Sequence, residues 1–177
     1  KINVVLERLG QEFNASHVYL FEKRPANDNE FILSMTYEWT APGLESDLGT
    51  PEFQNLPTNP MGFERMYKIL DNGEPLVGSS SFFTEAEKEY LTSINVMALL
   101  EIRVIVDGKH WGTLGVDDIS NKREWNAMEV DVIKVAANVL SAAIKRQMDE
   151  DALKSELAER KRAEQALMFS EEKFSKA

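Results

Sequence analysis

Cysteine is absent from this 177-residue sequence, which excludes disulfides, thiolate metal sites, cysteine nucleophiles and thioether-linked chromophores. Nor does any apolar run approach the length of a membrane span, and no signal-peptide pattern opens the sequence. The absence of cysteine fits a reducing compartment, and we expect a cytoplasmic location. The absence of an apolar span predicts no membrane contact in this part of the protein. Lys1 already lies inside a helix-like run, and we therefore expect the chain to be a piece of a longer protein.

Basic residues are too few to balance the acidic ones, and the net charge is −10. Residues 1–144 carry the whole excess, with 12 basic against 22 acidic residues, whereas residues 145–177 hold eight of each. An acidic body repels phosphate backbones, so we expect no nucleic-acid partner. Hydrophobic residues make up 43% of the chain, which is enough for one packed domain with an appendage.

The hydrophobic periodicity predicts an α+β domain with an antiparallel sheet. Residues 31–39 alternate strictly, with apolar side chains at the odd positions, so we expect a strand with one face well buried. The other expected segments are helices over residues 1–13, 59–70 and 84–91 and strands over residues 16–23, 74–78 and 99–118, the last split by a hairpin turn at Asp107-Gly108. This order lacks the strand–helix–strand repeat of a parallel sheet.

Residue types at three places predict where helices of the middle segment begin and end. Asn59 and Pro60 suit the start of one helix, and Gly73 suits a left-handed stop after it. Thr84 and Glu87 have the spacing of a capping box, which predicts the start of a second short helix.

The last segment predicts a helix that continues far beyond the domain, since residues 127–168 alone would extend roughly 60 Å. One apolar stripe has the spacing of a coiled-coil seam and consists of Val130, Ile133, Ala137, Leu140 and Ile144. A second stripe lies on another side and consists of Val132, Val135, Val139 and Ala142. A helix that is apolar on two sides needs two neighbours, which we expect to be its own sheet and the same helix of a second copy. We place Ile133, Ala137, Leu140 and Ile144 on the dimer and output face.

Four segments together resemble a GAF domain of bacterial multidomain signalling proteins: "YEWTAPGLES", "LPTNPMGFERMYKILDNGEPL", "VDGKHWGTLGVDD" and "REWNAMEVDVIKVAANVLSAAIKRQ". The resemblance covers residues 1–146 and implies an antiparallel sheet flanked by helices, with a long C-terminal helix. Residues 147–177, which include "LAERKRAEQALMFSEEKFSKA", resemble a helical linker that leads into the start of a truncated PAS domain.

The resemblance implies a regulatory domain that senses a small molecule and dimerises within a larger signalling protein. The output domain of such a protein is typically a histidine kinase, a diguanylate cyclase or a phosphodiesterase, and none of their catalytic motifs is present in this sequence. We therefore expect no enzymatic activity from this segment. The alternative is a ligand-free dimerisation and spacer module, in which the pocket is filled by side chains.

In GAF domains the small-molecule pocket lies between one face of the sheet and the middle helices and loops. Carried onto this sequence, the expected wall residues are Tyr37, Trp39, Phe63, Met66, Tyr67, Phe82, Glu101, Arg103 and Trp111. The competing interpretation for each aromatic residue is an ordinary core position. Arg103 stands inside an apolar strand, so we expect it to be exposed, paired with Glu101, or available to an anionic ligand.

Residues near the start of the last helix allow two interpretations. Asn121, Lys122, Trp125 and Glu129 loosely match the NK…F…DE signature of GAF domains that bind cyclic nucleotides. The same stretch also suits helix initiation, because Asn126 and Glu129 have the spacing of a capping box between two apolar staple positions. We favour the second interpretation, a joint between sheet and helix.

The remaining polar candidates favour neither a cofactor nor a metal site. Asp117 and Asp118 end a strand but point to opposite faces, so we expect solvated carboxylates rather than an acid–base pair. His17 alternates with aromatic residues and should fill a sheet face, while His110 lies on a hairpin tip and should be exposed. We therefore do not expect haem, and the identity of any ligand stays open.

Overall fold

The computed structural model describes residues 1–27, 30–57, 64–79 and 81–175. In chain order its elements are α1 (Ile2–Phe13), β1 (His17–Asn27), β2 (Glu30–Thr40), the 3-10 helix η1 (Pro51–Phe53), β3 (Leu56–Pro57), α2 (Glu64–Asp71), β4 (Leu76–Ser79), α3 (Glu85–Ser93), β5 (Ala98–Val106), β6 (Lys109–Asp118) and α4 (Ala127–Ser175). The predicted α+β class is confirmed. Strand β3 was not expected, because turn residues dominate the sequence of its segment. The expected helix start at Asn59 and Pro60 lies outside the described residues.

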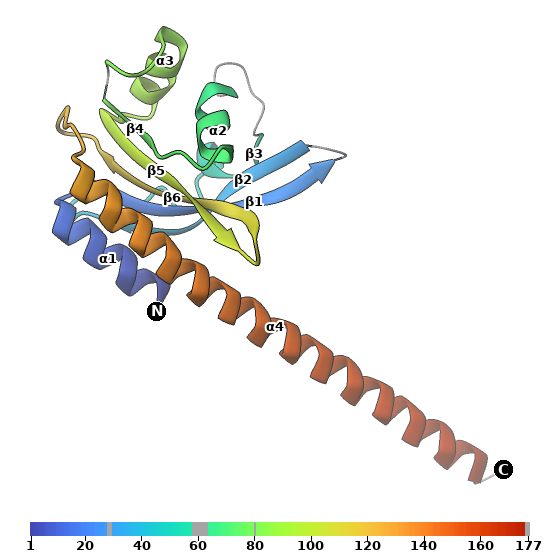
Figure 1. The fold of residues 1–177 in the computed structure, drawn as a ribbon. Coiled ribbons are helices and arrows are strands. Elements are labelled where there is room, and N and C mark those ends of the chain that lie inside the picture. Colours follow the sequence, from blue (N-terminus) through green and yellow to red (C-terminus); the bar gives the residue numbers. More distant parts are fainter. Residues whose placement is uncertain (28–29, 58–63, 80, 176–177) are drawn as a thin grey trace.

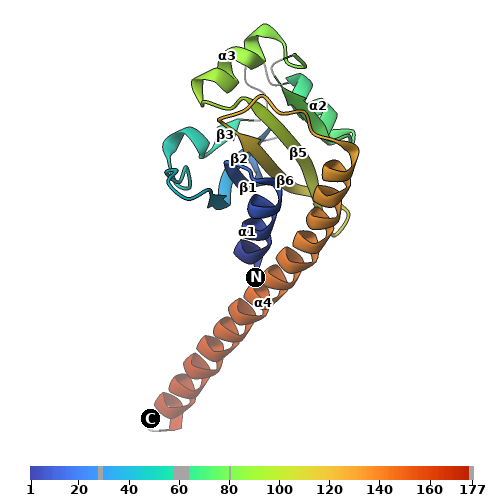
Figure 2. The same cartoon turned by 90° about the vertical axis from the view of Figure 1, so that its left-hand side faces the viewer.

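Six strands form one antiparallel sheet in the order β3-β2-β1-β6-β5-β4. Helices α1 and α4 cover one face of this sheet, and α2 and α3 lie over the other (Figures 1 and 2). Each face has its own apolar core, so the sheet separates two clusters of buried side chains. The strands at its centre therefore contact both clusters, one on each side.

Local sequence signals agree with the observed ends of several elements. The turn between β5 and β6 has positive φ at Asp107 (51°) and Gly108 (74°), as the two-residue hairpin requires. The capping box of α3 is present, because Glu87 N–H donates to Thr84 Oγ1 and Thr84 N–H donates to Glu87 Oε2. Gly73 has φ of 86° just after α2. These predictions are confirmed because each depends only on neighbouring residues.

Strand β2 does not keep the strict alternation that its sequence suggests. Its pairing with β1 runs through Leu20↔Tyr37 and then Phe21↔Met35, which leaves Thr36 as an extra residue in a β-bulge. The bulge reverses the direction of every side chain beyond it. Met35 therefore belongs to the core under α2 and α3, whereas Tyr37 packs against the core under α1 and α4.

The final helix α4 is 49 residues long, or about 74 Å, and it leaves the domain as a single continuous rod (Figures 1 and 2). Its first part packs on the sheet through Ile133, Ala137, Leu140 and Ile144, all at most 5% exposed. The stripe that we assigned to a dimer face is thus the sheet-facing side, because it completes the core of its own domain. In the described part of the chain, no helix is both long and apolar enough to span a membrane.

Candidate functional site

A cavity of about 220 Å³ lies between the sheet and helices α2 and α3. Most of its wall is apolar and comes from the second core cluster, including Phe21, Leu33, Met35, Leu70 and Leu99. Several polar side chains also reach it: His17, Tyr19, Glu38, Asp47, Glu101, Thr113 and Asp117. An apolar cavity with a few convergent polar groups is the usual form of a small-molecule site.

Tyr19 on β1 and Glu101 on β5 form a hydrogen bond across strand β6, which lies between these two strands. Tyr19 on β1 pairs with Gly115 on β6, and Gly115 pairs with Glu101 on β5. Because Gly115 has no side chain, the Tyr19 ring lies over it, and a Cβ placed there would be 2.1 Å from that ring. The Tyr19 hydroxyl thereby reaches Glu101 Oε1 and donates to it at 3.0 Å.

Burial has a strong effect on both members of this pair. It raises the pKa of the Glu101 carboxyl to about 7, although the hydrogen bond from Tyr19 favours the charged form, and the negative charge of Asp117 adds to the increase. Burial also raises the pKa of Tyr19 well above its ordinary value, and the charge of Glu101 contributes. Glu101 therefore changes protonation near neutral pH while Tyr19 remains a hydrogen-bond donor.

A second buried pair, His17 and Asp117, lies at another part of the cavity wall. The two residues are direct cross-strand partners, and His17 Nδ1 lies 2.8 Å from Asp117 Oδ1. Burial disfavours the charged imidazolium, but the hydrogen bond and charge of Asp117, with the charges of Glu38 and Asp47, raise the pKa of His17 above its ordinary value. Burial also raises the pKa of Asp117, against the opposing effect of His17.

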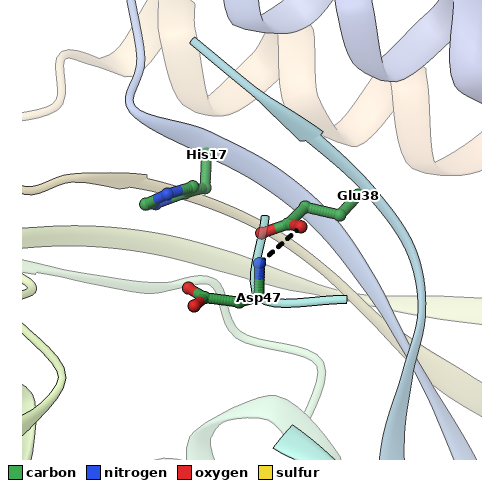
Figure 3. Close-up of side chains that lie close together, drawn as sticks. All are labelled: His17, Glu38 and Asp47. Atoms are coloured by element: carbon green, nitrogen blue, oxygen red, sulfur yellow. Dashed lines mark hydrogen bonds between the residues drawn. The ribbon is translucent and has the colours of Figure 1, made fainter. Parts of the chain in front are cut away.

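Glu38 holds the loop that follows β2 close to His17 and Asp117. Its Oε2 atom accepts hydrogen bonds from Ser46 Oγ (2.5 Å), Asp47 N–H (2.9 Å) and Leu48 N–H (3.1 Å). The carboxylates of Glu38 and Asp47 and the imidazole of His17 consequently lie close together (Figure 3). Residues from two strands and a loop are thus assembled into one polar cluster.

Only part of the expected pocket lines the observed cavity. Met66, Tyr67 and Glu101 do so. Tyr37, Trp39 and Trp111 pack against the core on the opposite face, the first two because of the bulge at Thr36. Phe63 lies outside the described residues.

Phe82 and Arg103 also lie outside the cavity wall. Phe82 is 43% exposed and stacks beneath the Arg65 guanidinium, whose centre is 4.6 Å from the ring. Arg103 donates through Nη1 to the Asp71 carbonyl oxygen at 2.9 Å instead of pairing with Glu101. This strand arginine therefore secures the end of α2, and Glu101 is left to Tyr19.

Sequence reasoning missed the polar cluster at the cavity. The alternation of His17 with Tyr19 and Phe21 did place the histidine correctly on a sheet face. Which face of the sheet carries Glu38 depends on the bulge at Thr36, which the sequence does not indicate. Nothing in the sequence predicts that Asp47, in the following loop, lies beside it. Asp117 is buried (5% exposed) rather than solvated, because His17 lies directly opposite it.

The residues that resemble a cyclic-nucleotide signature lie away from the cavity and form the joint to α4. Asn126 Oδ1 accepts from Glu129 N–H at 3.0 Å, and Glu129 Oε2 accepts from Asn126 N–H at 2.9 Å, so the predicted capping box is confirmed. Trp125 is buried against Phe13, while Lys122 is exposed. Asn126 and Glu129 thus start the helix, and the structure gives this stretch no place in the cavity.

The other two polar candidates have structural partners that the sequence did not indicate. Asp118 is only 4% exposed, and its Oδ1 accepts from the N–H groups of Ser120 and Asn121 at 2.8 and 2.9 Å. His110 is not exposed as expected, because its Nδ1 lies 2.8 Å from Asp71 Oδ1. Asp118 therefore stabilises the turn after β6, and His110 links β6 to the end of α2.

Comparison with known proteins gives a consistent result. The family model described as GAF domain matches residues 2–144. The methanogenesis regulatory histidine kinase FilI of Methanothrix harundinacea is 33% identical over 142 residues, which are 80% of this chain and 16% of that protein. An uncharacterized protein of Azorhizobium caulinodans is 27% identical over 160 residues, 88% of this chain and 22% of that protein. The chain thus spans about a fifth or less of the curated relatives' length.

Solved structures agree on the fold. The photoproduct state of GAF3 from Slr1393 of Synechocystis sp. PCC6803 superposes with a TM-score of 0.68 at 19% identity, covering 86% of this chain and 96% of that one. At this level of identity the similarity establishes the arrangement of strands and helices and nothing about ligands.

Proposed function

The chain belongs to the GAF domain family, and on that basis we propose that it binds a small molecule in the cavity between sheet and helices and thereby regulates a histidine kinase. GAF domains are sensory rather than catalytic, and the relative FilI is a regulatory histidine kinase, so a sensory role in signalling is well supported. The kinase, or a diguanylate cyclase or phosphodiesterase in its place, would be encoded in the part of the protein beyond this chain. The observation that carries the proposal is the cavity itself, with polar groups set into apolar walls.

The wall chemistry defines the kind of ligand. A volume of about 220 Å³ and a mostly apolar wall suit a compact molecule with a hydrocarbon or aromatic body. Glu101 and Asp117 are acidic groups at the wall, so a hydrogen-bond donor or a cationic group on the ligand is favoured. A ligand that lacks such a group would leave a buried acceptor unpaired and would bind more weakly. This difference in affinity would provide selectivity.

Strands β5 and β6 connect the cavity to the output helix. Leu99 and Glu101 face the cavity, whereas Leu100 and Ile102 between and beside them belong to the core that packs on α4. A ligand that prefers one arrangement of these strands would shift the packing of α4 by its difference in affinity for the two arrangements. We propose that this shift passes along α4 to the next domain, which we expect to be a PAS domain after the linker 147–177.

Native mass spectrometry of the purified chain tests whether a ligand is present. We expect extra mass that disappears on denaturation, and a clearly smaller bound fraction for Glu101→Gln, because the charged acceptor is lost while the shape is kept. Glu124→Gln, an exposed position outside the cavity, should bind like the wild type. If wild-type chains are bare and stay bare in the presence of cell extract metabolites, the ligand-free spacer module is the better interpretation.

A further inference from the structure

Metal-binding atoms from three separate elements meet at the polar part of the cavity. His17 comes from β1, Glu38 from β2 and Asp47 from the loop after β2, and one ligand atom of each lies within 4.8 Å of the others (Figure 3). Two donors on one first-row cation lie at most about 4.2 Å apart, since each bond is about 2.1 Å long. Small side-chain movements would therefore close the three donors around an ion.

Asp117 holds the imidazole of His17 from one side. His17 Nδ1 lies 2.8 Å from Asp117 Oδ1, and the histidine is only 7% exposed. Donation from Nδ1–H to a carboxylate leaves the lone pair on Nε2, and it fixes the plane of the ring. Histidines that bind metals are commonly held by a carboxylate on their other nitrogen in this way.

Glu38 offers an oxygen that lacks a partner. Three donors hold Oε2, whereas Oε1 is buried and accepts no hydrogen bond from any residue that the structure describes. A buried carboxylate oxygen without a partner is costly, and native structures seldom keep one without a reason. A bound cation would supply the missing partner.

The net charge of the cluster also favours a bound cation. Glu38, Asp47 and Asp117 surround a single imidazole. Among the side chains of residues 1–26, 30–57, 64–79 and 81–170, no lysine or arginine forms an ion pair with any of these three carboxylates. A half-buried cluster with this excess of negative charge is stabilised by a cation.

We propose that His17, Glu38 and Asp47 bind a divalent first-row transition cation such as Zn²⁺, with Asp117 as a positioning residue. One imidazole nitrogen with two carboxylate oxygens suits Zn²⁺ and its neighbours better than Mg²⁺ or Ca²⁺, which prefer oxygen alone. All three donors line the cavity, so the open coordination positions face it. A small molecule with a hydroxyl or amine group could both bind the ion and donate to the acidic wall, and it would complete the site; this last step rests on the proposed sensory function, whereas metal binding does not.

The chain offers a matched control for this site. His110 also bonds through Nδ1 to a carboxylate, Asp71, at the same distance of 2.8 Å. Lys23 occupies that carboxylate as well, at 3.1 Å, and the described residues supply no third ligand there. His110→Gln should therefore leave metal binding unchanged.

Titration of the tag-free chain with Zn²⁺ alone, after dialysis against a chelator, tests the proposal by calorimetry. We expect one saturable ion per chain, with at least about tenfold weaker binding in His17→Gln, Glu38→Gln and Asp47→Asn, since each loses a donor. Asp117→Asn should weaken binding by about 10- to 100-fold and change the visible spectrum of bound Co²⁺, because the ring orientation is altered.

Two results would overturn the assignment. One is the absence of saturable Zn²⁺ binding by the wild type, and the other is equal binding by the wild type and by correctly folded Glu38→Gln and Asp47→Asn. Circular dichroism and thermal unfolding establish the fold of each variant. The titration contains no organic ligand. A failure to bind Zn²⁺ would therefore overturn the metal site alone, while the mass spectrum tests small-molecule binding separately.

Discussion

Glu101 shows how much one residue's environment depends on its neighbours two strands away. The missing side chain of Gly115 lets Tyr19 cross β6, and the resulting bond positions Glu101 at the cavity wall. Burial at this place raises the pKa of Glu101 to about 7. A carboxylate in a strand was expected to be a pocket contact or a partner of Arg103, and only the cross-strand register identifies Tyr19 as its partner.

This pKa predicts a pH dependence of stability. The folded-state pKa of Glu101 lies above its unfolded value, so the folded chain binds the proton more tightly. Stability from this group is therefore present at low pH and is lost as pH rises through about 7, by on the order of 2 kcal/mol. Urea unfolding at pH 5 and pH 8 should show this decrease in the wild type and a smaller one in Glu101→Gln. Equal decreases in the two proteins would show that other groups are responsible.

At the scale of elements, local signals were predictable and pairing was not. The capping boxes at Thr84 and Asn126 and the hairpin at Asp107 depend on neighbouring residues, and sequence was sufficient for them. The bulge at Thr36 depends on how β2 meets β1, so strict alternation assigned Tyr37 to the wrong face. The two stripes of α4 are similar in composition, and only the sheet decides which of them is buried.

The three-strand arrangement under Tyr19 makes Gly115 a sensitive position. Gly115→Ala would place a Cβ 2.1 Å from the Tyr19 ring, so we expect a loss of about 1–3 kcal/mol in unfolding free energy. The same substitution in a Tyr19→Leu background should cost less, because the ring is gone. Chemical denaturation of the four proteins in this double-mutant cycle measures the coupling. No coupling would mean that the ring does not constrain this position.

At the scale of the whole molecule, a domain with a core on each side of one sheet extends a helix about 74 Å long. The sheet-facing stripe of α4 is satisfied within the chain, but Val132, Val135 and Val139 are 43%, 63% and 52% exposed. A row of exposed apolar residues on a helix is typical of an interface. This row, rather than Ile133 and its neighbours, is the surface that we propose for a parallel dimer, continuing past Ile144 toward Leu153 and Leu157.

Cysteine crosslinking tests the dimer, and the absence of natural cysteines makes the background clean. Leu153→Cys and Leu157→Cys, at positions 57% and 49% exposed, should form disulfides between chains under mild oxidation. Ser155→Cys lies on the opposite side of the helix and should crosslink far less. Non-reducing gels at several protein concentrations give the readout. Equal crosslinking at all three positions, or at none, would contradict an ordered parallel pair.

The continuity of α4 also sets a rule for how this domain can be joined to others. Each residue of a helix turns the chain by about 100° and advances it by about 1.5 Å, so the length of the helix fixes the rotational phase of whatever follows. Inserting seven residues after Ile144 nearly restores that phase, whereas inserting two turns the next domain by about 200°. Fusion partners should therefore be exchangeable in whole heptads, with the sign of the response depending on phase rather than on distance.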